Sequence, residues 1–147
     1  LLNVGFGMTA AVNKLQRIMG LKYCGKLKNA DRCLGTSERP VVFITHMEHH
    51  SNHTSWYETV ADVVVIPPGK DLKVDLNKME DTLNKYKDRK VKIGSFSAAS
   101  NVTGILNPIH EMAEIMHKHG GVAFSDFAAA GPYIDINMHP GKDNYLD

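Results

Sequence analysis

The stretch PVVFIT, residues 40–45, decides the fold. It is a run of apolar and mostly β-branched residues, with no polar residue in alternate positions and a proline at its start. Such a run is typical of a strand whose two faces are both buried, as in a parallel sheet. Four further short apolar segments are interpreted in the same way, as strands, at 1–7, 61–68, 91–100 and 121–127.

The segments between these predicted strands have the spacing of amphipathic helices. In 74–87, for example, Leu76, Met79, Leu83 and Tyr86 fall on one helical face. Strands that alternate with helices predict an α/β fold, a three-layer sandwich built on a mostly parallel sheet. The predicted helices are 9–20, 51–60, 74–87 and 107–121.

The composition is that of an ordinary soluble domain. The chain has 147 residues, of which 43% are hydrophobic and 22% charged, and its formal net charge is +1. This balance gives no electrostatic reason to expect a nucleic acid or an anionic membrane as partner. No apolar run approaches the roughly 20 residues that span a bilayer. Since the chain does not begin with Met and shows no signal peptide, we expect a processed chain or a fragment.

The two cysteines, Cys24 and Cys33, are too few for a disulfide framework. They lie nine residues apart in a polar segment, so a local disulfide is geometrically feasible. The favoured interpretation is a reduced pair, which fits a cytoplasmic protein, with an organelle as the alternative location.

The segments that follow the predicted strands have the most unusual composition in the chain. Ligands of parallel α/β sheets bind beyond the carboxyl ends of the strands, so these segments are the candidate site. They are GFGMT (5–9), HMEHHSNH (46–53), SAASNVTG (97–104) and SDFAAAG (125–131).

Taken singly, each segment also has a simpler explanation. Glycines before a helix that starts near Thr9 suit an anion, but they equally suit a tight turn. Asp126 among small apolar residues needs a cationic partner or several donors, or else it caps a helix. The residues 100–104 have ordinary turn chemistry.

Four histidines, His46, His49, His50 and His53, crowd into eight residues. Two pairs have the four-residue spacing of metal ligands on a helix, but Glu48 precedes His49, which is not the order of a zinc protease helix. The segment also crosses a strand end and a turn, so the rings are not expected to face one way. Exposed loop histidines and a metal site both stay open on these grounds.

Four motifs together resemble the class V aminotransferases, the group of pyridoxal 5′-phosphate (PLP) enzymes that includes cysteine desulfurases and selenocysteine lyases. Residues 48–52, EHHSN, resemble the family's Glu-His-His-Ala/Ser-Asn motif, and residues 100–108 resemble its Ser-Asn-Val-x-Gly-x-x-x-Pro. Residues 119–126 are similar to its His-Gly, strand and Asp stretch, and residues 7–13 to its phosphate loop. The motifs occur in the family's order and cover essentially the whole chain.

The resemblance implies a role for each residue around a cofactor ring. His49 would stack on the PLP pyridine and relay protons as the catalytic residue, while Asp126 would pair with the pyridinium nitrogen. Asn101 would bond the phenolic oxygen or the substrate carboxylate. Ala128 would cover the ring face opposite His49, and His50 would support the loop.

The backbone N–H groups of Met8 and Thr9, with the Thr9 hydroxyl, would hold the phosphate. Three positions depart from the family, and at one of them Phe127 stands in place of a small Gly. Met8 stands where Ser or Thr is common, and Ala129 stands where a Gln usually bonds the phenolic oxygen. The family's Schiff-base lysine lies beyond the end of this chain, and Lys142 comes too early in a turn-like context to replace it.

Residues 1–147 are therefore expected to be a partial PLP-binding large domain of fold type I, without the lysine segment and the small domain. The parent would act on an amino acid, most readily by cysteine desulfuration or selenocysteine lysis, as a homodimer; transamination, epimerisation and kynureninase-like cleavage stay open. The alternatives are a pseudoenzyme or binding module with this fold and, after it, a metal-binding protein that uses the histidines.

Overall fold

The computed structural model describes residues 3–22, 34–35 and 37–147. Its centre is a four-stranded sheet in which every pair of neighbouring strands is parallel, in the order β2-β1-β3-β4. The strands are β1 (Val41–Thr45), β2 (Asp62–Ile66), β3 (Lys92–Ser97) and β4 (Val122–Asp126). All four lie within segments predicted as strands from the sequence.

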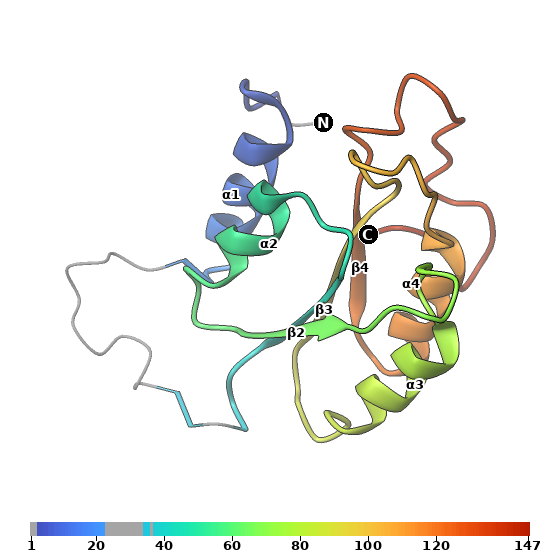
Figure 1. Ribbon diagram of the computed structural model, residues 1–147. Helices are drawn as coiled ribbons and strands as arrows, with labels where there is room; N and C mark the ends of the chain where they lie inside the picture. Colours follow the sequence, from blue (N-terminus) through green and yellow to red (C-terminus); the bar gives the residue numbers. More distant parts are fainter. Residues whose placement is uncertain (1–2, 23–33, 36) are drawn as a thin grey trace.

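Two helices cover each face of this sheet (Figure 1). One layer holds α1 (Gly7–Ile18) and α2 (His50–Trp56), and the other holds α3 (Leu76–Asn84) and α4 (Ile109–Lys118). The predicted α/β sandwich of three layers with a parallel sheet is confirmed.

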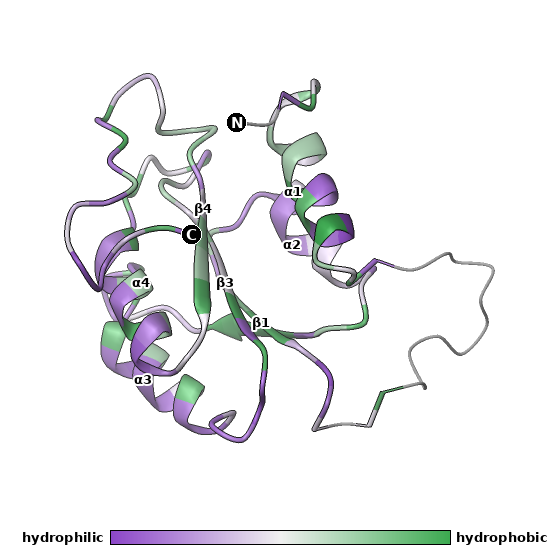
Figure 2. Ribbon diagram, turned by 180° about the vertical axis from the view of Figure 1, so that it is seen from behind, coloured by the Kyte–Doolittle hydropathy of each residue, from purple (hydrophilic) through white to green (hydrophobic). Residues whose placement is uncertain are grey.

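Strand β1 shows why the sheet is buried on both sides. Val41 and Phe43 pack with α3 and α4, whereas Val42 and Ile44 pack with α1 and α2, and all four side chains are fully buried. Since β1 also pairs with β2 on one edge and β3 on the other, every residue of the strand is inside. Figure 2 shows apolar colour along β1 and mixed polar and apolar colour along the helices.

Helices α2, α3 and α4 are shorter than their periodicity predicts, whereas α1 has the predicted length of 12 residues. Helix α3 starts at Leu76 since the Asp75 side chain accepts hydrogen bonds from Asn77 N and Lys78 N, at 3.0 and 3.2 Å. Helix α2 ends at Trp56, four residues before the predicted end.

The predicted strand at 1–7 is wrong for its described part, because residues 3–6 form no strand. Gly5, Phe6 and Gly7 have successive φ angles of 65°, 42° and 62°, in the left-handed region that an extended strand never visits. Helix α1 therefore begins at Gly7, two residues before its predicted start. Cys24 and Cys33, and the interpretations attached to them, lie outside the described residues.

No helix in the described part of the chain is long and apolar enough to cross a lipid bilayer. The last residues of the chain pack along β4 instead, where the backbone N–H of Asp147 donates to Ala123 O at 2.9 Å and Leu146 is buried. The side chain of Asp147 also accepts from Ala123 N at 2.8 Å, so two hydrogen bonds join Asp147 to Ala123.

His117 on α4 holds this terminal segment through both ring nitrogens. Nδ1 lies 2.7 Å from Asp143 O and Nε2 lies 3.0 Å from Asp147 Oδ2. Both partners are acceptors, so only the protonated imidazolium donates both bonds. Burial alone lowers the pKa of His117, but the Asp143 carbonyl and the Asp147 carboxylate outweigh it, and the pKa is raised above 6.5.

A raised histidine pKa adds stability that is complete below the unfolded pKa and disappears as pH rises through the folded pKa. We therefore expect His117→Gln to lower the thermal midpoint clearly at about pH 5.5 and much less at about pH 8.5. Thermal melts of wild type and variant across this range measure it, with His139→Gln as a control on the same segment. A difference in thermal midpoint between wild type and His117→Gln that is the same at every pH would contradict the raised pKa of His117.

Candidate functional site

A pocket of about 320 Å³ opens at the carboxyl edge of the sheet. It brings together the ends of β3 and β4, the first turn of α1 and the start of α2, as the position of a site in a parallel sheet predicts. All seven residues predicted for the site line it. They are Met8, Thr9, His49, Asn101, Asp126, Ala128 and Ala129.

His49 stands at the N-cap of α2, where its ring is exposed to the pocket. Nδ1 accepts from the backbone N–H of Ser51 at 3.2 Å and lies 2.8 Å from Ser51 Oγ. A backbone N–H can only donate, so Nδ1 is an acceptor and the neutral ring carries its proton on Nε2. The cap thus fixes one tautomer and leaves Nε2–H as the group that His49 can offer.

Asp126 is the last residue of β4 and is only 5% exposed. Its Oδ1 accepts from Ala128 N at 2.8 Å, and no other described residue donates to the carboxylate. The residues after it form turns, so the helix-cap interpretation is wrong. A buried carboxylate with an open oxygen favours a donor, above all a cationic one, inside the pocket.

The start of α1 offers free backbone donors. Phe6 at its N-cap makes no side-chain cap, and the first N–H groups of a helix have no partner within it. Met8 and Thr9 carry such groups and line the pocket. Together with the helix dipole, these donors suit an anion such as a phosphate.

Three further pocket residues lie in the candidate segments 46–53 and 97–104 but were not named individually from the sequence: Ser51, Ser97 and Ala99. Ser97 and Ala99 fell inside the predicted strand 91–100, whereas β3 ends at Ser97 and the following residues turn into the pocket wall. The signal that could have found them is their place at the carboxyl end of a central strand.

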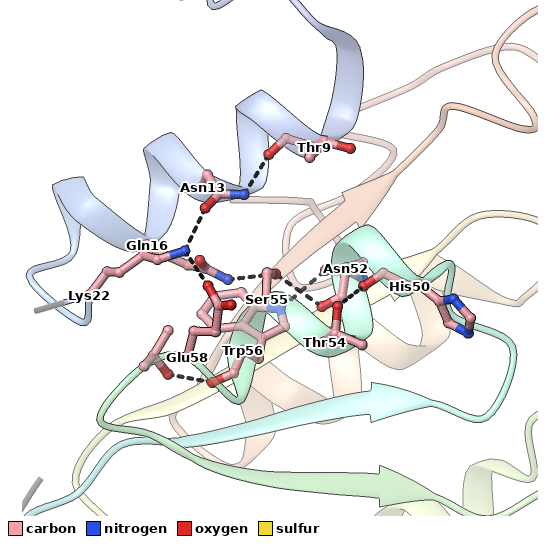
Figure 3. Close-up of polar contacts among 11 residues, drawn as sticks. Thr9, Asn13, Gln16, Lys22, His50, Asn52, Thr54, Ser55, Trp56 and Glu58 are labelled. Carbon is pink, nitrogen blue, oxygen red and sulfur yellow. Dashed lines mark hydrogen bonds and ion pairs between the residues drawn. The ribbon is translucent and has the colours of Figure 1, made fainter. Parts of the chain in front are cut away.

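Figure 3 shows how the two helices of the site are held together. On the buried side, Gln16 of α1 donates to Ser55 Oγ of α2 at 2.9 Å. On the outer side, Lys22 bonds Asn13 Oδ1 at 2.6 Å and Glu58 at 2.9 Å. These contacts set the helix that carries Met8 and Thr9 against the helix that His49 caps.

The other histidines of the cluster point to separate partners. His46 Nε2 lies 2.8 Å from Leu72 O, and His53 Nε2 lies 3.3 Å from Tyr57 OH. The rings of His49 and His50 are 6.3 Å apart. Within the described residues, no three His, Cys, Asp or Glu side chains are grouped so that they could hold a metal ion.

The sequence model of one protein family, aminotransferase class-V, matches residues 28–141 of this chain. The match therefore includes all four strands of the sheet, the His49 loop and the Asp126 loop, and it begins after α1.

Similar proteins carry the name cysteine desulfurase. A probable cysteine desulfurase of Halalkalibacterium halodurans is 36% identical over 101 residues, which cover 66% of this chain and 24% of that protein. A cysteine desulfurase of Escherichia coli is 33% identical over 110 residues, 72% of this chain and 25% of its own length. The chain thus spans about a quarter of the length of the relatives it matches.

Solved structures agree on the fold. The crystal structure of a NifS-like protein from Rickettsia africae aligns with a TM-score of 0.59 and 29% identity, covering 67% of this chain and 27% of that one.

Proposed function

Because this chain belongs to the aminotransferase class-V family, a family of PLP-dependent enzymes with the fold-type-I architecture, we propose that its pocket binds PLP. One observation carries the proposal. A single pocket is lined by an imidazole, a buried carboxylate with an open oxygen, and helix N–H groups that have no partner in the helix. These groups match the stacking surface, the pyridine nitrogen and the phosphate of that cofactor.

Each group has a defined task in this proposal. Met8 and Thr9 donate backbone N–H groups to the phosphate, and the buried Asp126 carboxylate accepts from the ring nitrogen. His49 lies against the ring and presents its Nε2 proton, and the small side chain of Ala128 leaves room for the ring. When PLP is bound, it supplies the electron sink for chemistry at an amino acid.

The full-length protein, in this proposal, is a cytoplasmic homodimer that acts on an amino acid. The names of its relatives favour cysteine desulfuration, with selenocysteine lysis as the close variant. The chain of 147 residues by itself is proposed to be a partial large domain that binds cofactor without turning over substrate. Lys142 does not line the pocket, which supports the view that another lysine of the full-length protein serves the reaction.

The binding test uses pyridoxamine 5′-phosphate, which has the ring, nitrogen and phosphate of PLP but cannot condense with surface lysines. Trp56, the single tryptophan, lies on α2 and reports binding through its fluorescence. Saturable quenching is expected, with pyridoxamine that lacks the phosphate binding at least about tenfold more weakly, because several charge-assisted bonds are lost. Equal affinities, or no saturable binding, would reject the proposal.

A pseudoenzyme or binding module that keeps the fold but not the cofactor is the second candidate, and Ala129 is the observation that favours it. A neighbouring pocket of about 660 Å³, also lined by Ala129, has room for a longer side chain. We expect Ala129→Gln to restore one hydrogen bond to the ring oxygen, worth about 1 kcal/mol, and so to tighten pyridoxamine 5′-phosphate about fivefold.

Ala129→Leu is the matched control for this gain, since it adds similar bulk without an amide. The same titration is made for both variants. If Leu tightens binding as much as Gln, the gain comes from apolar contact, and the missing family glutamine does not explain the affinity of this chain.

A further inference from the structure

We propose that Glu48 is a positioning residue, whose buried carboxylate fixes where His49 presents its ring to the pocket. The proposal rests on the proposed function for the meaning of His49, but its geometry is independent of any cofactor. Glu48 does not line the pocket and so would act through its neighbour in the chain.

Glu48 is only 8% exposed, and both of its carboxylate oxygens accept hydrogen bonds from several donors. Oε1 accepts from Thr45 N at 3.2 Å, Thr45 Oγ1 at 2.6 Å and Ser97 N at 3.0 Å. Oε2 accepts from Ser97 Oγ at 2.7 Å and Asn52 Nδ2 at 2.6 Å. One side chain therefore ties the end of β1, the end of β3 and the first turns of α2.

His49 itself has no comparable anchor among the described residues. Its side-chain bonds run only to Ser51, inside the same turn of α2. That turn can fix the ring relative to the helix but cannot fix the helix relative to the sheet, where Ser97 and Asp126 line the pocket. The bonds of Glu48 to Ser97 and Asn52 make that second connection, together with the two direct bonds between Asn52 and Ser95 of β3.

Only a carboxylate fits this position. Asn52 must direct its Nδ2 at Glu48, because its Oδ1 already accepts from Ser95 Oγ at 2.7 Å and Trp56 Nε1 at 3.1 Å. Backbone N–H groups of Thr45 and Ser97 meet the other oxygen. Each oxygen thus faces at least one obligate donor, and the amide of a glutamine would set N–H against N–H in either orientation.

The test compares Glu48→Gln with Thr59→Val in the chain without cofactor. Thr59 is a buried residue beyond the other end of α2, and its hydroxyl bonds Trp56 O at 2.7 Å and Ala61 N at 3.2 Å. Nitrogen-15 NMR of the His49 ring reads the tautomer directly. In wild type, Nδ1 is expected to be an unprotonated acceptor and Nε2 to carry the proton.

Without the bonds of Glu48 the first turn of α2 is expected to loosen, so that the Ser51 cap on Nδ1 of His49 frays and the two ring nitrogens move toward a mixture of tautomers. The affinity for pyridoxamine 5′-phosphate is expected to fall roughly tenfold, as for other supporting residues behind a binding group. Thr59→Val should lower the thermal midpoint but leave the nitrogen shifts and the affinity unchanged. Thr45→Val removes one bond to Glu48, and also the bond from Met47 N, with little change in shape, and an intermediate shift of the same kind is expected.

The proposal is overturned if Glu48→Gln loses stability but keeps the wild-type nitrogen shifts, since Glu48 would then stabilise the fold alone. If Glu48→Gln does not fold, the Thr45→Val shifts decide in the same way. A wild-type chain that binds no pyridoxamine 5′-phosphate would reject the proposed function, yet the nitrogen shifts would still test the positioning role.

Discussion

Replacing Asp126 with asparagine is expected to weaken the binding of pyridoxamine 5′-phosphate about thirtyfold, from the loss of about 2 kcal/mol in a charged hydrogen bond. Asparagine keeps an oxygen for the Ala128 N–H, so the turn is preserved. It removes only the negative charge that, in the proposed site, would face the ring nitrogen. At 5% exposure this carboxylate is little screened by water, which is why the effect is large.

Tryptophan fluorescence titration measures the change, and Asp81→Asn, on the exposed surface of α3, makes the same chemical substitution away from the pocket. The control should bind as wild type does. Equal binding by Asp126→Asn and wild type would remove Asp126 from the site and, with it, the main electrostatic reason to expect a pyridine ring there.

A second large effect is expected from Asn52→Asp, which should lower the free energy of unfolding by about 3 kcal/mol or more near neutral pH. Asn52 is fully buried, and its Nδ2 donates to Glu48 Oε2 at 2.6 Å and to Ser95 O at 3.2 Å. An oxygen in its place would face two acceptors, one of them a carboxylate. Shape is unchanged, so electrostatic repulsion accounts for the loss.

The sign of the pH dependence follows from the same contact. Two facing carboxylates share a proton, so their folded pKa is raised, and stability is present at low pH and lost as pH rises through that pKa. Denaturant unfolding at about pH 4.5 and about pH 7.5 should show a small and a large deficit respectively. Asn77→Asp, on the exposed face of α3, is the control. A deficit that is equal at both pH values would contradict the explanation.

The core of this fold was predictable because its signals are local. The β-branched run at 40–45 located β1 without tertiary information, and the family resemblance that four motifs suggested is confirmed. The ends of the elements were less predictable, since contacts set them. The predicted strand 91–100 stops at Ser97 because the chain turns, and Ser100 N bonds Ile105 O at 3.0 Å.

In the candidate site, too, the features with a local sequence signal were predictable and those that depend on contacts between distant residues were not. The motifs predicted seven of the ten residues that line the pocket, because each motif is a continuous stretch of sequence. They gave no sign that Glu48 meets Ser97, since those residues are 49 positions apart and only the parallel pairing of β1 with β3 brings them together. Nor did they predict the left-handed turn before α1, where two glycines were recognised but Phe6 was interpreted as part of a strand.

The contrast between β1 and α1 has a consequence for dynamics. Amide hydrogens of Val42 and Ile44 are paired in the middle of the sheet and sealed on both faces, so their exchange with solvent requires global unfolding. Helix α1 buries only Val12 and Gln16, so its amides exchange through a local opening of lower free energy. An anion bound by the first turn of α1 would make that local opening less frequent, so the amide hydrogens of α1 would exchange more slowly. The exchange rates of the β1 amides would not change, so the difference would measure how far the anion orders the α1 side of the pocket.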